Sequence, residues 1–264
     1  MMLIRGHNKD IKEVDPMKRF FALMLCAAML LCAGTTMAAD YTIATDTAFR
    51  PFEYTDDNGE LVGIDVELLA AIAADQGFTY SIEPLGWDAS IAACQAGQKD
   101  GMIAGASITE ERKASGWIFS DSYFNATQSM AVAQGTPIKG FEDLKGHSVA
   151  VKADTLSNEY ADKLAEQYGF KVVRYGSSLA VYMAVTGGEC AACFEDAPVI
   201  DDYVRNGGVF LQMVDGTANE GAEYRFVVFS PDKQELVDKF NAGLANIQAN
   251  GVYDEIIARY LSKP

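Results

Sequence analysis

Short apolar runs alternate with longer amphipathic stretches along most of the chain, which is the pattern of strands followed by helices. In the first half this pattern predicts strands at 41–44, 79–83 and 101–104, and helices at 66–76, 87–96 and 109–115. We expect Asp65 to cap the first of these helices and Gly77 to end it. Turn residues at 56–59 lie between two short apolar runs and predict a hairpin over 54–64.

The same alternation restarts in the second half. Strands are expected at 148–152, 171–174 and 190–194, and helices at 155–168, 178–186 and 197–206. A strand at 224–229 and helices within 233–261 close the chain. Strands that alternate with helices are typical of parallel sheets, so the predicted fold class is α/β with two similar lobes. Ligand sites favour the cleft between such lobes and the carboxyl ends of the strands.

The N-terminal segment has the features of a secretory signal peptide. A basic pair, Lys18-Arg19, precedes an apolar run at 20–33, and small residues follow up to a cleavage site after Ala38 or Ala39. The run is too short to span a bilayer. Leucine precedes both cysteines of the segment, so we expect no lipoprotein anchor, and Met17 is an alternative start. The sequence therefore predicts a signal peptide over 1–38 and a periplasmic protein.

Composition narrows the possible partners. The 264 residues include 21 basic and 37 acidic side chains, for a net charge of −16, which argues against nucleic acid and anionic membranes. After removal of residues 1–38, His147 is the one histidine left, which disfavours a Ser-His-Asp triad or a histidine-rich metal site. We expect no cofactor, no metal and no catalytic residue.

Two cysteines form a CxxC pattern at 190–193. Redox and metal pairs of this kind usually lie at turns or helix starts. Here the pattern falls in an expected strand, where residues three apart point to opposite faces. We interpret Cys190 and Cys193 as structural thiols, in preference to a metal or redox site.

Arg112 is a candidate binding residue because of its position. It follows Thr109, which can cap the helix expected at 109–115, and a cation in the first helical turn is unfavourable. An arginine held there can clamp a carboxylate through two parallel hydrogen bonds. A solvated arginine paired with Asp121 or a nearby glutamate is an equally good interpretation.

Four further residues admit two interpretations each. Thr155 and Asp196 precede expected helices, so each can act as an N-cap or face a ligand, Asp196 through a salt bridge to an ammonium group. Phe49 and Trp87 can stack on a ligand, although aromatic residues are more often part of the core.

Several segments together resemble the periplasmic polar amino acid-binding proteins of ABC importers, and the glutamine-binding members most of all. The similar segments lie at 44–49, 51–53, 63–67, 104–113, 143–146, 149–152 and 250–260. The resemblance implies a type II periplasmic binding protein fold with two hinge crossings, near 123–128 and 218–224. Lobe 1 would comprise 39–124 and 223–264, and lobe 2 would comprise 125–222.

The resemblance also implies roles for particular residues. Arg112 would bind the ligand α-carboxylate, with the backbone N–H groups of Ser107 and Leu156 and the Thr155 hydroxyl. Asp196 would bind the α-ammonium, with the Gly105 carbonyl and the Ser107 hydroxyl. Aromatic rings would enclose the ligand side chain, and Asp46 and Lys152 would contact its polar end. The full set implied is Asp46, Phe49, Trp87, Ala104, Gly105, Ser107, Arg112, Lys152, Thr155, Leu156, Glu195 and Asp196.

Two departures from the family pattern bear on the ligand. Leu156 replaces a residue that is often small or β-branched, and Glu195 replaces a histidine of the glutamine-binding members. We expect Lys152 to pair with Glu195, which leaves Asp46 to accept a hydrogen bond from an amide or a cation. The expected ligand is therefore glutamine first and a basic amino acid second, with glutamate and aspartate disfavoured.

The implied function is solute capture by hinge closure and delivery to an ABC permease in the inner membrane, by a monomer that is not an enzyme. Two alternatives remain. A periplasmic cyclohexadienyl-type dehydratase has the same fold and would use Glu195 as a general acid. A ligand-binding sensor would act on a membrane receptor in trans.

Overall fold

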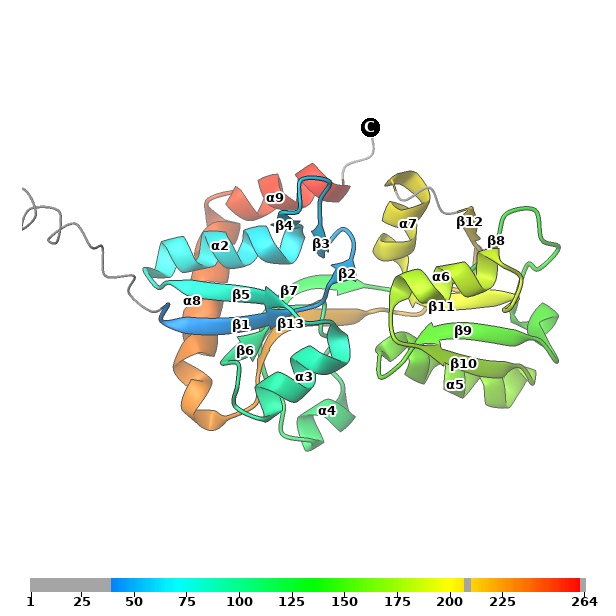
Figure 1. Ribbon diagram of the computed structural model, residues 1–264, viewed down its shortest axis with the longest axis horizontal. Coiled ribbons are helices and arrows are strands. Elements are labelled where there is room, and N and C mark those ends of the chain that lie inside the picture. Colours follow the sequence, from blue (N-terminus) through cyan, green and yellow to red (C-terminus); the bar gives the residue numbers. More distant parts are fainter. Residues whose placement is uncertain (1–38, 207–209, 262–264) are drawn as a thin grey trace, which may run out of the picture. The chain divides into compact units, whose positions relative to one another are not determined.

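The computed structural model describes residues 39–206 and 210–261, and two five-stranded sheets organise this part of the chain (Figure 1). The signal peptide predicted over 1–38, with the alternative start at Met17, lies outside the described residues. No helix within the described residues has the length and apolar character that a membrane crossing requires.

The first sheet has the strand order β5-β1-β6-β13-β7. Its parallel strands are β1 (Tyr41–Thr45), β5 (Tyr80–Pro84) and β6 (Gly101–Met102), and β13 (Ala222–Val228) runs antiparallel to β6 and to β7 (Ile118–Ala126). A small sheet joins β2 (Ala48–Phe49), β3 (Glu53–Thr55) and β4 (Leu61–Val62). The helices of this half are α2 (Ile64–Gln76), α3 (Trp87–Gln95), α4 (Glu110–Ala114), α8 (Gln234–Ala249) and α9 (Val252–Leu261), with a 3₁₀ turn, η2, at Pro231–Lys233.

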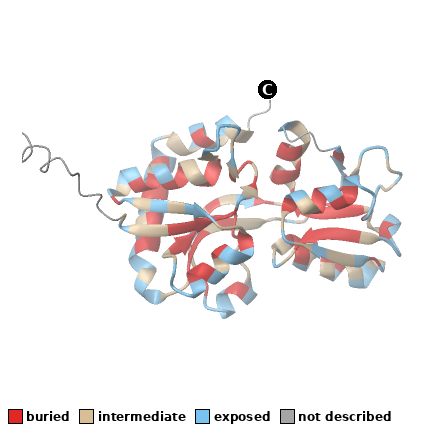
Figure 2. Cartoon of the chain, in the orientation of Figure 1, coloured by how far each residue is buried: buried red, intermediate tan, exposed pale blue. Residues whose placement is uncertain are grey.

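Alternation along the strands places a core on each face of this sheet. Ile43 and Phe226 belong to the cluster that includes Leu68 of α2 and Phe240 of α8. Their neighbours along the strands, such as Ala44, belong to a separate cluster with the residues of α3. Successive side chains of a strand point to opposite faces, so the sheet is covered on both sides. Figure 2 shows the inner strands as largely buried.

The second sheet has the order β10-β9-β11-β8-β12. Its parallel strands are β9 (Ser148–Lys152), β10 (Lys171–Tyr175) and β11 (Ala192–Asp196), and β8 (Gln128–Ala133) runs antiparallel to β11 and to β12 (Leu211–Met213). Helix α5 (Leu156–Tyr168) shares one core cluster with β9, and α6 (Ser178–Thr186) shares another. The remaining elements are α7 (Ala197–Asn206) and a 3₁₀ turn, η1, at Phe141–Leu144.

The α/β class with two mostly parallel sheets is confirmed. Helices α5, α6 and α7 occupy the ranges that cap and glycine positions predict, except that Thr155 and not Leu156 was expected as the first residue of α5. The chain passes from the first sheet to the second between β7 and β8, around residue 127, and returns before β13. The lobe boundaries at 124/125 and 222/223 stay a prediction.

Three sequence-based expectations are wrong in detail. Gly63 is the N-cap of α2, and Asp65 lies inside the first turn with its side chain fully buried. Strand β6 is only two residues long. Cys190 precedes β11, so only Cys193 lies in the strand; both thiols are buried and free.

Close packing at Gly101 gives a test of the first sheet. A Cβ there would lie 2.5 Å from the Phe226 ring and 2.9 Å from the Val227 carbonyl oxygen, so the sheet must distort to accept it. We expect Gly101→Ala to lower the free energy of unfolding by about 1–3 kcal/mol in urea denaturation. The control is Gly176→Ala, where a Cβ meets nothing within 4 Å. Equal stability of the two variants would contradict the packing described.

Candidate functional site

Residues that follow strand ends converge on one small cavity. It has a volume of about 20 Å³, which is enough for about one water molecule. Loops after β1 and β6 approach it from the first sheet, and the ends of β9 and β11 approach it from the second. Eleven of the twelve residues expected at the site line it: Phe49, Trp87, Ala104, Gly105, Ser107, Arg112, Lys152, Thr155, Leu156, Glu195 and Asp196.

Arg112 is buried, which contradicts the interpretation of a solvated surface arginine. Its guanidinium donates to the Ser107 carbonyl at 2.7 Å and to the Asp154 carbonyl at 3.0 Å. It also lies 5.2 Å from the Trp87 ring and 5.0 Å from the Trp117 ring. Burial lowers the pKa of Arg112. The local cause of its position is α4, whose N-cap Thr109 accepts a hydrogen bond from the Arg112 N–H as predicted.

Asp46 completes the set through an ion pair with Lys152, and both side chains are buried. The expected pair between Lys152 and Glu195 is therefore wrong. Asp46 directly follows the end of β1, and Lys152 is the last residue of β9. The two strand ends lie close enough in the folded chain for these side chains to form the pair. The Lys152 ammonium also lies 5.2 Å from the Phe49 ring, and both of these residues line the cavity.

Glu195 and Asp196 are adjacent buried carboxylates at the end of β11. Glu195 accepts hydrogen bonds from the Ser178 hydroxyl at 2.7 Å and from the Asp196 N–H at 3.0 Å. Burial and the neighbouring Asp196 charge raise the pKa of Glu195 to about 7. Asp196 accepts from the Gln128 amide at 2.6 Å and from the Tyr224 hydroxyl, while burial raises its pKa.

Sequence reasoning missed Ser178, Gln128 and Tyr224, which hold the two carboxylates. Gln128 begins β8, Tyr224 lies in β13, and Ser178 begins α6, so their only shared feature is proximity in the folded chain. A pairing rule could have found Gln128, because an antiparallel neighbour of β11 must place some residue opposite Asp196.

Thr155 is the N-cap of α5, as one interpretation predicted. Its hydroxyl accepts from the Asn158 N–H at 3.3 Å and donates to the Lys152 carbonyl at 2.8 Å. The Trp87 indole donates to the Asp154 carbonyl at 3.1 Å, so that oxygen accepts from both Trp87 and Arg112. The ligand-facing roles of Thr155 and Trp87 stay predictions.

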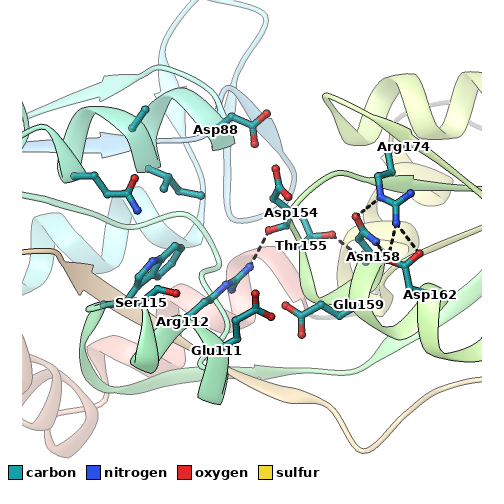
Figure 3. A pocket seen from close by; sticks show the side chains of 14 residues that line it. Asp88, Glu111, Arg112, Ser115, Asp154, Thr155, Asn158, Glu159, Asp162 and Arg174 are labelled. Carbon is teal, nitrogen blue, oxygen red and sulfur yellow. Dashed lines mark hydrogen bonds and ion pairs between the residues drawn. The ribbon is translucent and has the colours of Figure 1, made fainter.

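A larger pocket of about 540 Å³ adjoins the cavity and shares Arg112 and Thr155 with it (Figure 3). Figure 3 shows carboxylates of both halves around it, among them Asp88, Glu111 and Glu159. Arg174 is bound to Asp162 and Asn158 at its far side. Within the part of the chain that the structure describes, no group of three or more His, Cys, Asp or Glu side chains is arranged to hold a metal ion.

Comparison with known proteins adds the following relatives. Residues 41–263 match the family described as bacterial extracellular solute-binding proteins, family 3. A protein of Neisseria gonorrhoeae named probable histidine-binding protein is 29% identical over 224 residues, covering 83% of this chain and 82% of its own.

Two solved structures are also similar. The arginine-, lysine-, histidine-binding protein ArtJ of Geobacillus stearothermophilus has 32% identity and a TM-score of 0.77, covering 84% of this chain and 95% of its own. An ancestral arginine-binding protein bound to glutamine has 33% identity and a TM-score of 0.78, covering 86% of this chain and all of its own. The type II binding protein fold implied by the sequence agrees with these neighbours.

The raised pKa of Glu195 predicts an unusual pH dependence of stability. The carboxyl titrates near 4.5 in the unfolded chain and near 7 in the folded protein. The folded state thus holds the proton more tightly, and this group's contribution to stability falls as the pH rises from about 4.5 to 7. Glu195→Gln removes that cost. We expect the ligand-free variant to be more stable than the wild type at pH 8, by at least about 1 kcal/mol, and equally stable at pH 4.5.

Thermal unfolding from pH 4.5 to 8 measures this difference. The control is Glu166→Gln, which makes the same side-chain change at an exposed position of α5 and should leave stability unchanged throughout. A stability difference for Glu195→Gln that does not vary with pH would contradict the assignment.

Proposed function

Because the chain belongs to family 3 of the bacterial extracellular solute-binding proteins, we propose that it captures a free polar amino acid between its two sheets and delivers it to an ABC permease. The observation that carries this proposal is the pairing of one buried guanidinium, Arg112, with one buried carboxylate, Asp196, in the lining of a single cavity. This pair is complementary to the two charges of an amino acid zwitterion.

The α-carboxylate would bind Arg112. Two parallel hydrogen bonds from a guanidinium to a carboxylate are stronger than its bonds to two neutral carbonyls. The ligand would therefore take the place of the Asp154 carbonyl as an acceptor of Arg112. The α-ammonium would bind Asp196, whose carboxylate is held by hydrogen bonds from Gln128 and Tyr224.

Binding would require the two halves to separate and close again. A cavity of about 20 Å³ is far smaller than an amino acid, and its walls come from both sheets. The chain crosses between the sheets twice, between β7 and β8 and before β13, and these connections would act as hinges. Contacts from both halves would then favour the closed state when the ligand is present.

Charge balance supports a basic side chain over the glutamine that we expected first. Asp46 and Lys152 neutralise each other, Arg112 and Asp196 take the zwitterion, and Glu195 is left without a cationic partner among the described residues. A cationic side chain would make the loaded site neutral, whereas an acidic one would add a second uncompensated charge. The names of the histidine-binding and arginine-, lysine-, histidine-binding relatives agree with this choice.

Glutamine is the second candidate, for a specific reason. An amide can donate to Asp46 and accept from Lys152, so it could bridge that pair without added charge. Glu195 would then need to keep its proton, which its raised pKa of about 7 permits. The ancestral arginine-binding relative bound to glutamine supports the view that one site can serve both ligands.

The main test is calorimetric titration of residues 39–264, refolded to remove carried-over ligand, with each of the twenty amino acids and ornithine. We expect tight binding of arginine, lysine or histidine, weaker binding of glutamine and none of glutamate. Arg112→Ala should weaken binding by about 100-fold or more, because it removes one partner of a buried charge pair. The matched control is Arg174→Ala, whose side chain is half exposed and bound to Asp162. Near-normal affinity in Arg112→Ala would refute its assigned role.

Glu195 provides a test of ligand class. With a basic ligand, Glu195→Gln removes the balancing charge, and we expect affinity for arginine to fall about tenfold or more while affinity for glutamine holds or rises. Glu159→Gln changes a carboxylate that lines only the adjoining pocket and should leave the ratio of the two affinities unaltered. An unchanged ratio in Glu195→Gln would contradict the charge-balance argument.

The raised pKa of Glu195 also suits a general acid at neutral pH, which is an observation in favour of the dehydratase alternative. Incubation with prephenate or arogenate and an absorbance scan for product would distinguish the two. We expect no product.

A further inference from the structure

Asp65 is a fully buried carboxylate close to the cavity, and it has no role in the ligand contacts proposed above. Asp65, in the first turn of α2, accepts hydrogen bonds from the Gly105 N–H at 3.0 Å and from the Tyr123 hydroxyl at 2.8 Å. The Gly105 N–H also lies 3.1 Å from the Tyr123 oxygen, so both groups hold the same amide. Asp65 and Tyr123 therefore fix a peptide bond whose two residues, Ala104 and Gly105, line the cavity.

Aromatic rings also pack closely against Gly105. Gly105 has a φ of +56°, and a Cβ there would lie 2.6 Å from the Phe49 ring and 3.2 Å from the Tyr224 ring. Only glycine fits between these rings in that conformation. The Asp65 carboxylate thus holds the peptide at its N–H and aromatic rings pack against Gly105, so the peptide has little freedom to turn.

The direction of the N–H determines the direction of the preceding carbonyl. In a trans peptide the N–H and the C=O point opposite ways, so anchoring the Gly105 N–H on Asp65 turns the Ala104 carbonyl away from Asp65. None of the hydrogen bonds within residues 39–206 and 210–261 ends on the carbonyl oxygen of Ala104 or Gly105. Buried carbonyls are normally paired, so these oxygens are available to a donor in the cavity.

A second buried carboxyl group, Glu53 of β3, is the neighbour of Asp65. Both Glu53 oxygens and the second Asp65 oxygen are buried with no donor among the described residues. Burial and the Asp65 charge raise the pKa of Glu53 well above its usual value. Asp65 has two donors and Glu53 has none, so Glu53 holds a proton more tightly than Asp65, although burial also raises the pKa of Asp65, to about 7.

We propose that Asp65, with Glu53 as its protonated partner, is a positioning residue for the ligand α-ammonium, acting through the Ala104–Gly105 peptide. Its hydrogen bond orients the Ala104 carbonyl oxygen so that the ammonium can donate to it, beside its ion pair with Asp196. This inference rests on the proposed function, because it assumes that an α-ammonium enters the cavity.

The experiment compares two probes in each variant, arginine and its α-deamino analogue 5-guanidinopentanoate, by calorimetry and competition. Asp65→Asn replaces the carboxylate that anchors Gly105. We expect it to weaken arginine binding about tenfold or more and to leave the analogue unaffected, because the analogue has no ammonium to place. Asp57→Asn is the matched control: it makes the same side-chain change at an exposed position, and both affinities should match those of the wild type.

Failure of the proposed function and failure of the Asp65 role give different results. If the wild type binds neither arginine nor any other amino acid, the proposed function fails. If the wild type binds arginine and Asp65→Asn loses both probes equally, or neither, the positioning role alone is overturned. Should Asp65→Asn fail to fold, Tyr123→Phe removes one of the two groups that hold the Gly105 amide, and a loss confined to arginine is still expected.

Discussion

A buried guanidinium that must always have partners is the interaction on which the site depends. Arg112 is satisfied by one carbonyl from each half, Ser107 and Asp154, and by two tryptophan rings. Among the described residues other than glycine, only Asp154 has a positive φ, at 54°. Such a conformation costs of order 1–3 kcal/mol and is kept where surrounding contacts hold it. Here those contacts are the bonds from Arg112 and Trp87 to the Asp154 carbonyl.

A ligand carboxylate would thus compete with a protein carbonyl and not with water. This competition lowers the free energy gained on ligand binding. The bonds to the protein carbonyls also keep the guanidinium in place when the site is closed. The other charged side chains of the lining also have partners within the protein. Lys152 is neutralised by Asp46, and Asp196 and Glu195 are held by neutral donors from distant strands and helices. The remaining imbalance of one negative charge is what favours a basic ligand in this account.

Sequence alone predicts the parts of this arrangement that local chemistry controls. Thr109 and Thr155 cap their helices as expected, and glycines end α2 and α5 where expected. Strands β7 and β8 were missed, because residues 118–133 carry no clear turn signal and mix polar with apolar side chains.

Local chemistry does not determine which charges meet. The partner of Lys152 depends on how the ends of β1 and β9 approach each other. Asp65 was predicted to be an N-cap because its contact with Gly105, 40 residues away, is not visible in the local sequence. The list of site residues came from a resemblance that spans nearly the whole chain after residue 38. Their supporting side chains, such as Gln128 and Tyr224, came only from the folded structure.

A crystal structure of residues 39–264 with bound arginine tests the central claim most directly. The account predicts the ligand carboxylate on the Arg112 guanidinium, the α-ammonium on Asp196, and an Asp154 carbonyl that no longer accepts from Arg112. A ligand carboxylate on Lys152, or a ligand held in the adjoining pocket between Asp88 and Glu159, would contradict it.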